Sequence, residues 1–224
     1  MATRSLAKRI WYDYLRMMSR LVAAGLFQLR CNGRERVPAH GPVLVVSNHQ
    51  SHFDPVLIAS VCNRRLNFLA RQTLFRFAPF GWLIKSLDAI PLDRDGLGMA
   101  GLKETLRRLK RGEMVLVFPE GTRTRDGNVG PLKPGFCALV HRTEAAVVPV
   151  AIDGAFDAWP RWHRWPRRAC IRMEFGEPLT AEEAKGLADG ALMAEVDRRL
   201  RVCHAAARAG RLHALNRDAA MHPA

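Results

Sequence analysis

The sequence has no long apolar run. None of its hydrophobic stretches approaches the roughly 18 uninterrupted apolar residues of a membrane-spanning helix. Its first residues also lack the charged, apolar and small-residue regions of a secretory signal. We therefore expect neither a membrane span nor export.

Paired cysteines are also absent. The five cysteines are odd in number and dispersed, and no two of them form a Cys-x-x-Cys motif. A disulfide framework or a structural zinc site would show even numbers or close, regular spacings. The pattern therefore indicates reduced thiols and a cytoplasmic protein.

Acidic residues are few relative to basic ones. The 224-residue chain has 35 Lys and Arg against 21 Asp and Glu, which gives a formal net charge of +14. Hydrophobic content of 48% and charged content of 25% are ordinary for a globular protein, so the sign of the charge is the unusual feature. Such a charge implies an anionic partner: nucleic acid, a membrane surface or a phosphorylated substrate.

The length suffices for one domain with a full core, and no repeat or low-complexity linker divides it. Strand-like and helix-like segments alternate after residue 42. This predicts a single α/β domain with a mixed, mostly parallel sheet flanked by helices. We expect strands at 43–46, 67–70, 89–92, 114–118, 147–152 and 171–175, and helices at 55–62, 99–110, 136–141 and from 180 to about 207.

Two other segments complete this organisation. Residues 30–42 read as a polar connector, and Pro149 favours an edge or a bulge for its strand. Residues 210–224 are expected to form a disordered tail.

Residues 1–30 are expected to form an N-terminal amphipathic helical segment ahead of the α/β domain. A mostly cationic stripe, with Arg9, Arg16 and Arg20, opposes a broad apolar face. Such a helix suits a membrane interface, but it equally suits packing against the core of its own domain. An organelle transit peptide is a third interpretation.

The first candidate site lies in the loop after the 43–46 strand. His49 is in this loop, and Asp54 follows five residues later, where Pro55 starts a helix. A returning loop can bring the carboxylate to one imidazole nitrogen. The other nitrogen then faces the crevice at the carboxyl end of the sheet, where open α/β folds bind ligands. An imidazole held in this way can act as a general base toward a hydroxyl.

Other interpretations of this loop remain open. Asp54 can be only a helix cap, and His49 only a loop histidine that donates to a carbonyl. His49, His52 and Asp54 also echo the ligand pattern of dinuclear zinc hydrolases. That pattern requires further histidines where Ser47 and Pro55 stand, so we predict no metal site.

A second polar loop follows the 114–118 strand. Glu120 and Arg123 can project from it into the same crevice as His49, and Gly121 permits a tight turn. Alone, this loop indicates little. It becomes stronger evidence for a site together with the histidine loop, which precedes it at this separation in the chain.

Taken together, these loops resemble the glycerolipid acyltransferase family, which includes the 1-acylglycerol-3-phosphate O-acyltransferases. The spacing of His49 and Asp54 matches the family's first block, and residues 118–123 match the third. Residues 80–94 resemble the second block and residues 148–152 the fourth. The four blocks occur in the family's order, and no motif position departs from the family pattern.

The resemblance implies an activity. Family members transfer a fatty acyl group from an acyl-CoA or acyl-ACP thioester, a co-substrate, to the free hydroxyl of 1-acylglycerol 3-phosphate, giving phosphatidic acid. No cofactor and no acyl-enzyme are expected, and the sequence indeed lacks the Gly-x-Ser-x-Gly motif of acyl-serine hydrolases. By resemblance, His49 is the catalytic base and Asp54 orients it. The acceptor is assigned to five residues, with the arginines on its phosphate: Arg94, Glu120, Gly121, Thr122 and Arg123.

With the alternation of strands and helices, the resemblance makes residues 31–209 the expected acyltransferase domain, and the basic charge favours a place at the cytoplasmic face of a membrane. Its expected partners are a lysophospholipid, an acyl thioester, an anionic membrane surface and an acyl carrier protein. Alternatives are another acceptor, such as glycerol 3-phosphate or another lysolipid, and a non-catalytic basic protein that binds membranes or nucleic acid. Residues 159–168 interleave tryptophan with arginine and suit an anionic membrane surface, a nucleic acid or a solvated hairpin. We expect no nucleic acid partner.

Overall fold

The computed structural model describes residues 5–72, 82, 84–87, 89–92 and 99–221. Its helices are α1 (Leu6–Phe27), α2 (Asp54–Val61), α4 (Met99–Lys110), α5 (Cys137–His141), α6 (Ala155–Ala158), α7 (Ala181–Gly186) and α8 (Asp189–Met221), with 3₁₀ turns η1 (Arg34–Arg36) and η3 (Pro134–Phe136). Its strands are β1 (Arg30–Asn32), β2 (Val43–Ser47), β3 (Leu66–Arg71), β4 (Ile90–Leu92), β5 (Met114–Val117), β6 (Ala146–Asp153) and β7 (Arg172–Phe175).

The strands of the described residues form one seven-stranded sheet in the order β1-β7-β6-β2-β5-β3-β4. Every neighbouring pair is parallel except β6 with β7. All residues of β2 and β5 are buried, as expected for parallel strands that are covered on both faces and therefore read as continuous apolar runs. The predicted α/β fold with a mixed, mostly parallel sheet is confirmed.

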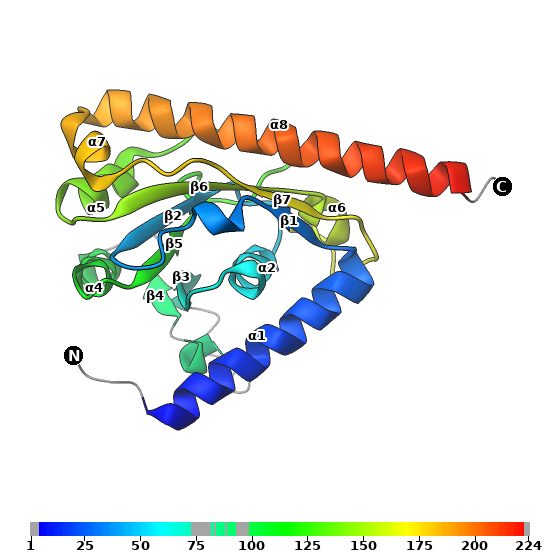
Figure 1. Cartoon of the computed structure of the whole chain (residues 1–224), viewed down its shortest axis with the longest axis horizontal. Coiled ribbons are helices and arrows are strands. Elements are labelled where there is room, and N and C mark those ends of the chain that lie inside the picture. Colours follow the sequence, from blue (N-terminus) through cyan, green and yellow to red (C-terminus); the bar gives the residue numbers. More distant parts are fainter. Residues whose placement is uncertain (1–4, 73–81, 83, 88, 93–98, 222–224) are drawn as a thin grey trace.

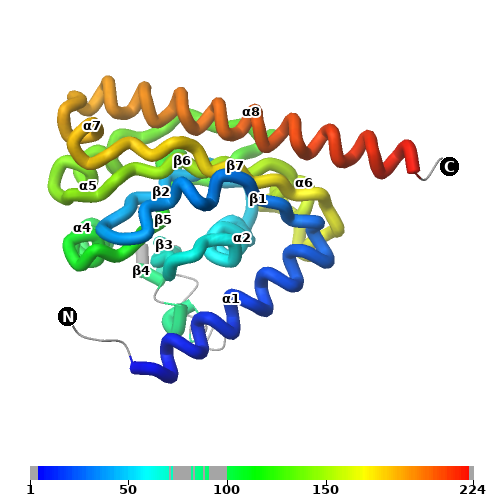
Figure 2. Tube along the Cα trace, viewed as in Figure 1, coloured from blue at the N-terminus to red at the C-terminus, as the bar shows by residue number. Residues whose placement is uncertain are grey.

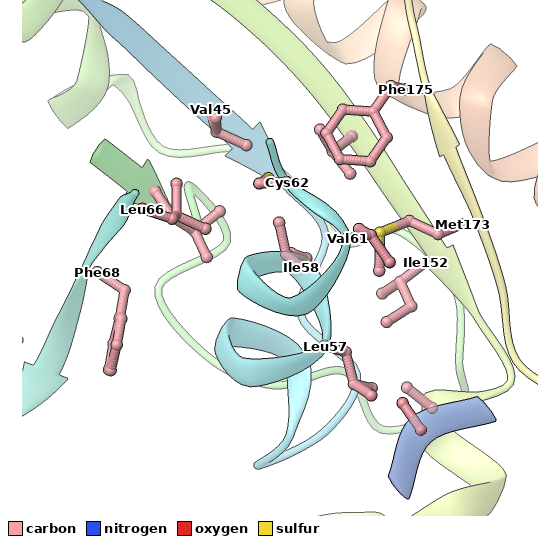
Figure 3. Close-up of a cluster of buried hydrophobic side chains, with 14 of the residues drawn as sticks. Val45, Leu57, Ile58, Val61, Cys62, Leu66, Phe68, Ile152, Met173 and Phe175 are labelled. Atoms are coloured by element: carbon pink, nitrogen blue, oxygen red, sulfur yellow. The ribbon is translucent and has the colours of Figure 1, made fainter. Parts of the chain in front are cut away.

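The sheet separates two hydrophobic cores. Successive side chains of a strand point to opposite faces, so Val43 and Val45 of β2 enter one core, and Leu44 and Val46 enter the other. The first core lies under α2 and the C-terminal end of α1, and Figure 3 shows α2 seated on the strands there. The second lies under α5, α7 and α8, on the opposite side of the sheet (Figures 1 and 2).

β6 is a central strand, so the prediction of an edge or a bulge at Pro149 is wrong. Pro149 pairs with Val46 of β2 on one side, while the β7 ladder on the other side begins only at Val150. Beyond that ladder the carbonyl of Pro149 accepts the Gly176 N–H at 2.9 Å. Proline is tolerated here because its missing N–H lies outside the ladder.

The residue 30–42 connector also differs from expectation, since it contains β1, which pairs with β7.

The end of the chain corrects two further expectations. The helix expected from residue 180 to about 207 is two helices: a capping box formed by Thr180 and Glu183 opens the short α7, and α8 begins at Asp189. α8 continues to Met221, so residues 210–221 are helical and not a disordered tail. The cause is tertiary: Arg211 pairs with Asp153 of β6, and Ala214 is buried.

α1 is one uninterrupted helix, but little of it is covered. Tyr12, Ala23 and Phe27 are its buried residues. Large apolar side chains along the rest of the helix are exposed: Leu6, Ile10, Tyr14, Met17, Met18, Leu21, Val22 and Leu26. Among the described residues, no helix combines the length and the hydrophobicity needed to cross a bilayer.

Candidate functional site

Three neighbouring parallel strands bring their carboxyl ends to one edge of the sheet. Val46 of β2 pairs with Val117 of β5 on one side and with Pro149 of β6 on the other. The loops that leave these strands therefore emerge together, at the edge where open α/β sheets bind ligands.

His49 and Asp54 form a hydrogen-bonded pair in the loop after β2. The His49 Nδ1 atom lies 2.7 Å from Asp54 Oδ2. The same oxygen accepts the backbone N–H groups of Gln50 at 2.6 Å and Ser51 at 2.7 Å. Asp54 is fully buried, and its carboxylate bonds the preceding loop, so its role in the structure is not that of a simple helix cap. The His49 side chain remains 20% exposed.

The loop after β5 fixes His49 from the other side. The Phe118 ring stacks on the imidazole with centroids 4.0 Å apart and planes 14° from parallel. Thr124 N–H donates to the His49 carbonyl at 2.7 Å. Both the ring and the backbone of His49 are thus held, which limits the rotation of its imidazole.

Glu120 joins these two loops. It is 5% exposed, and its Oε1 accepts the His49 N–H at 2.9 Å, while Oε2 accepts the Gly130 N–H at 3.2 Å. Burial raises the pKa of Glu120 to about 7, although the two backbone hydrogen bonds act in the opposite direction. The carboxyl group therefore braces the backbone of His49.

Two buried amides join the histidine loop to β6 and its neighbours. The Asn48 side chain donates to the Ile152 carbonyl and accepts the Ile152 N–H, both at 2.9 Å. Gln50 Nε2 donates to the Gly127 carbonyl at 2.7 Å, and Gln50 Oε1 accepts the Phe156 N–H at 3.2 Å. No role was predicted for these two amides from the sequence. The available signal was two amides flanking a histidine directly after a buried strand.

The other predicted acceptor residues lie on or near the turn after Glu120. Gly121 has a φ of +69°, in the left-handed region that favours glycine, and its N–H donates to the Phe118 carbonyl at 3.0 Å. Gly121 and Thr122 are exposed, and Arg123 is half-buried. Arg94 lies outside the described residues.

His52 is close enough to this turn to be affected by its charge. Burial, together with the charges of Arg123 and His49, lowers the pKa of His52 to about 4. For the metal interpretation, the described part of the chain contains no group of three His, Cys, Asp or Glu side chains arranged to hold an ion.

Helix α8 is attached to the end of β6, next to the site. Asp153, the last residue of β6, is 1% exposed and pairs with Arg208, Arg211 and His204 of α8. Arg208 Nη2 also donates at 3.2 Å to the Gly127 carbonyl that Gln50 uses. Asp153 was not among the predicted site residues, although it meets the criterion used for the other two loops: a polar residue at the carboxyl end of a buried strand.

Known proteins are similar to this chain in fold and in sequence. The structure is similar to the crystal structure of the 1-acyl-sn-glycerophosphate acyltransferase PlsC from Thermotoga maritima, with a TM-score of 0.78, 25% identity, and coverage of 91% of this chain and 82% of that one. The 1-acyl-sn-glycerol-3-phosphate acyltransferase of Pseudomonas aeruginosa is 31% identical over 179 residues, which are 77% of this chain and 66% of that protein.

A plant relative is similar over a shorter region. The chloroplastic 1-acyl-sn-glycerol-3-phosphate acyltransferase of Arabidopsis thaliana is 32% identical over 137 residues, which are 60% of this chain. The match covers 38% of the plant protein's own length. A profile of the acyltransferase family matches residues 28–153, which carry the loops after β2 and β5. This match spans more than half of the chain, and the chain belongs to the acyltransferase family.

Proposed function

We propose that this protein transfers a fatty acyl group from an acyl-CoA or acyl-ACP thioester to the free hydroxyl of 1-acylglycerol 3-phosphate, giving phosphatidic acid. The observation that carries the proposal is the His49–Asp54 pair at the carboxyl edge of the sheet in a chain of the acyltransferase family. The acceptor is supported by the names of the relatives, which are 1-acyl-sn-glycerol-3-phosphate acyltransferases.

In the proposed mechanism, Asp54 holds the proton of His49 Nδ1, which leaves Nε2 as the base. Nε2 takes the proton of the acceptor hydroxyl as its oxygen attacks the thioester carbonyl. The tetrahedral intermediate then collapses, the carbon–sulfur bond breaks, and the imidazolium gives the proton to the leaving thiolate. The buried carboxylate of Asp54 stabilises the imidazolium while it exists. No acyl-enzyme forms in this sequence of steps.

The phosphate of the acceptor is assigned to Arg123 and Arg94, because a guanidinium group binds phosphate through two parallel hydrogen bonds. Arg123 is half-buried on the turn that begins at Glu120. The assignment of Arg94 rests on the family resemblance. Gly121 and Thr122 belong to the same proposed acceptor site, and Glu120 serves it by holding the His49 backbone.

We also propose that α1 rests on the membrane that contains the acceptor. The exposed apolar side chains of this helix and the net charge of +14 suit an anionic bilayer surface. The acyl donor and the acyl carrier protein would then approach from the cytoplasmic side.

The test is a comparison of three variants in an acyl-transfer assay with 1-acylglycerol 3-phosphate. His49→Ala and Asp54→Asn should each lower kcat by about 10² to 10⁴-fold, because both remove general-base catalysis. His52→Ala is the matched control, since the same loop contains it and no role in proton transfer is assigned to it. Near-full turnover by folded His49→Ala would reject the mechanism.

A panel of acceptors tests the substrate class. Arg123→Ala should lower kcat/KM for the phosphorylated acceptor by about 10 to 100-fold, since it removes a charge-assisted hydrogen bond, and should leave monoacylglycerol almost unaffected. Arg123→Lys should recover part of the loss, because lysine keeps the charge without the planar fork. Equal losses for both acceptors would remove Arg123 from the phosphate site. Faster turnover of glycerol 3-phosphate would favour the alternative acceptor.

A further inference from the structure

A loop rich in tryptophan and arginine projects beside the site. We call residues 158–168 the Trp-Arg loop. Its base is closed by a hydrogen bond from the Arg167 N–H to the Ala158 carbonyl at 2.8 Å. Trp159 Nε1 donates to the His163 carbonyl at 2.8 Å, so an internal contact also fixes the course of the loop.

The base of the Trp-Arg loop is attached to the histidine loop. Ser51 Oγ donates to the Trp159 carbonyl at 2.9 Å. The Trp159 ring lies 5.0 Å from the His52 ring and 4.5 Å from the Phe53 ring, centroid to centroid. Whatever the tip of the loop contacts is therefore held next to the loop that carries His49.

The tip exposes both apolar and cationic side chains. Trp162 is 57% exposed and Trp165 is 72% exposed. Residues 158–168 contain no acidic residue, so the loop does not neutralise its own charge. Its four arginines are all exposed: Arg161, Arg164, Arg167 and Arg168.

The loop lies beside the C-terminal end of α1, a helix with many exposed apolar side chains. Phe53, which contacts Trp159, also lies 5.6 Å from Phe27, the last residue of α1. The Ile171 N–H, a few residues after the loop, donates to the Phe27 carbonyl at 2.9 Å. Figures 1 and 2 show the chain between α6 and β7 beside this end of α1. Leu26, one residue earlier, is 45% exposed.

We propose that the Trp-Arg loop is a second membrane-docking surface, in which Trp162 and Trp165 enter the interface of an anionic phospholipid bilayer and the arginines bind headgroup phosphates. Tryptophan favours the level of the headgroups, and clustered arginine is attracted to an anionic leaflet. The adjoining apolar residues of α1 favour a bilayer over a polynucleotide, which offers no hydrocarbon region. The loop brings the His49 loop against the bilayer, and in this respect the inference rests on the proposed lysolipid acceptor.

The experiment measures sedimentation of the full chain with vesicles of phosphatidylglycerol and phosphatidylcholine at equal amounts. Trp162→Ala/Trp165→Ala should lower the partition coefficient at least tenfold. Arg161→Gln/Arg164→Gln should lower it about 25-fold, taking about fivefold for each charge, and should have little effect with phosphatidylcholine alone. The control is Val202→Ala/Leu212→Ala, which removes two similarly exposed apolar side chains from α8 and should change nothing.

Two further measurements separate the alternatives. Both loop variants should turn over a monomeric short-chain acceptor at the parent rate and a vesicle-borne acceptor more slowly. Partition coefficients equal to the parent value in both variants would overturn the proposal. So would a loss of coenzyme A affinity, measured by calorimetry, with vesicle binding intact, since the loop would then bind the nucleotide of the donor. His49→Ala should bind vesicles like the parent, so a failure of the proposed chemistry leaves this test unaffected.

Discussion

The two long helices of this chain contact the sheet in different ways. α8 places a continuous stripe against it, at spacings of three and four residues, and this stripe is buried: Leu192, Val196, Leu200, Cys203 and Ala207. In α1 the buried residues are Tyr12 and, near the C-terminal end, Ala23 and Phe27. The other large apolar residues of α1 described above remain exposed.

The difference shows how the same kind of periodicity can serve two purposes. In α8 the sheet covers the apolar stripe named above, although Val202 and Leu212 outside it are exposed, and arginines beside the stripe reach Asp153. In α1 the domain covers only part of the apolar surface. Exposed apolar surface of this kind is typical of helices that bind a membrane or another protein. α8 therefore supports the site from within the fold, and α1 is free to contact something outside it.

The largest effect on stability should follow from removing the anchor of α8. Asp153→Ala leaves Arg208, Arg211 and His204 without their shared carboxylate. The free energy of unfolding should fall by about 3 kcal/mol, the lower end for a broken buried pair, because Arg208 is partly exposed and solvent screens its charge. Denaturant titration with linear extrapolation measures the loss.

Glu195→Ala provides the control on the same helix. Glu195 pairs with Arg198 and Arg199 at the surface, so its loss should cost no more than about 1 kcal/mol. Similar losses for the two variants would mean that Asp153 is not the anchor.

The free energy of unfolding should also depend on pH through Asp153, by on the order of 2 kcal/mol. Burial disfavours the ionised form of Asp153, but its contacts with His204 and Arg211 and the charge of Arg208 outweigh it, and the pKa falls to about 2. A carboxyl group with a lowered folded pKa stabilises the fold above its unfolded pKa of about 3.9 and loses this contribution as the pH falls toward 2. Between these values the parent should lose stability more steeply than Asp153→Asn. Parallel curves would contradict the prediction.

A smaller effect is expected where α1 does contact the domain. Tyr12 is 4% exposed, and its hydroxyl accepts the buried Leu66 N–H at 3.0 Å. Tyr12→Phe leaves that N–H without its acceptor and should lower the free energy of unfolding by about 1 to 2 kcal/mol. Tyr14, two residues later, is 54% exposed, so Tyr14→Phe should leave stability unchanged. Thermal unfolding of both variants against the parent measures the difference, and an unchanged Tyr12→Phe would remove this contact from the account.

Local patterns in the sequence predicted the fold class and the pair at the centre of the site. The apolar runs of β2 and β5 identified buried strands, and the polar residues directly after them identified the edge where His49 meets Asp54 and Glu120. The strands and the His49–Asp54 pair depend on neighbours in the chain, which periodicity and spacing report, while Glu120 reaches the same edge because β2 and β5 are parallel.

The remaining contacts of the site depend on residues far apart in the chain. Gln50 bonds Gly127 at a separation of 77 residues and Phe156 at 106 residues, and no spacing rule connects them. The extension of α8 beyond residue 207 likewise depends on Arg211 meeting Asp153, a contact that exists only in the folded chain. For α1, the sequence left two interpretations open because an apolar face looks the same whether or not the domain covers it.

The smallest effect on stability should occur on the exposed face of α1, and it tests the comparison most directly. Met17 and Leu21 are 58% and 59% exposed. Met17→Ser/Leu21→Ser should change the free energy of unfolding by no more than about 0.5 kcal/mol, since neither side chain contributes to the core. The same variant should sediment less with anionic vesicles, because apolar area that would enter the interface is gone. Leu200→Ser, on the buried stripe of α8, should do the opposite. The free energy of unfolding should fall by about 3 kcal/mol, because a hydroxyl group replaces a buried apolar side chain. Vesicle binding by the folded fraction should be unchanged. If Met17→Ser/Leu21→Ser instead destabilised the fold as Leu200→Ser does, the outer face of α1 would be part of the core in solution, and the two helices would serve the same purpose.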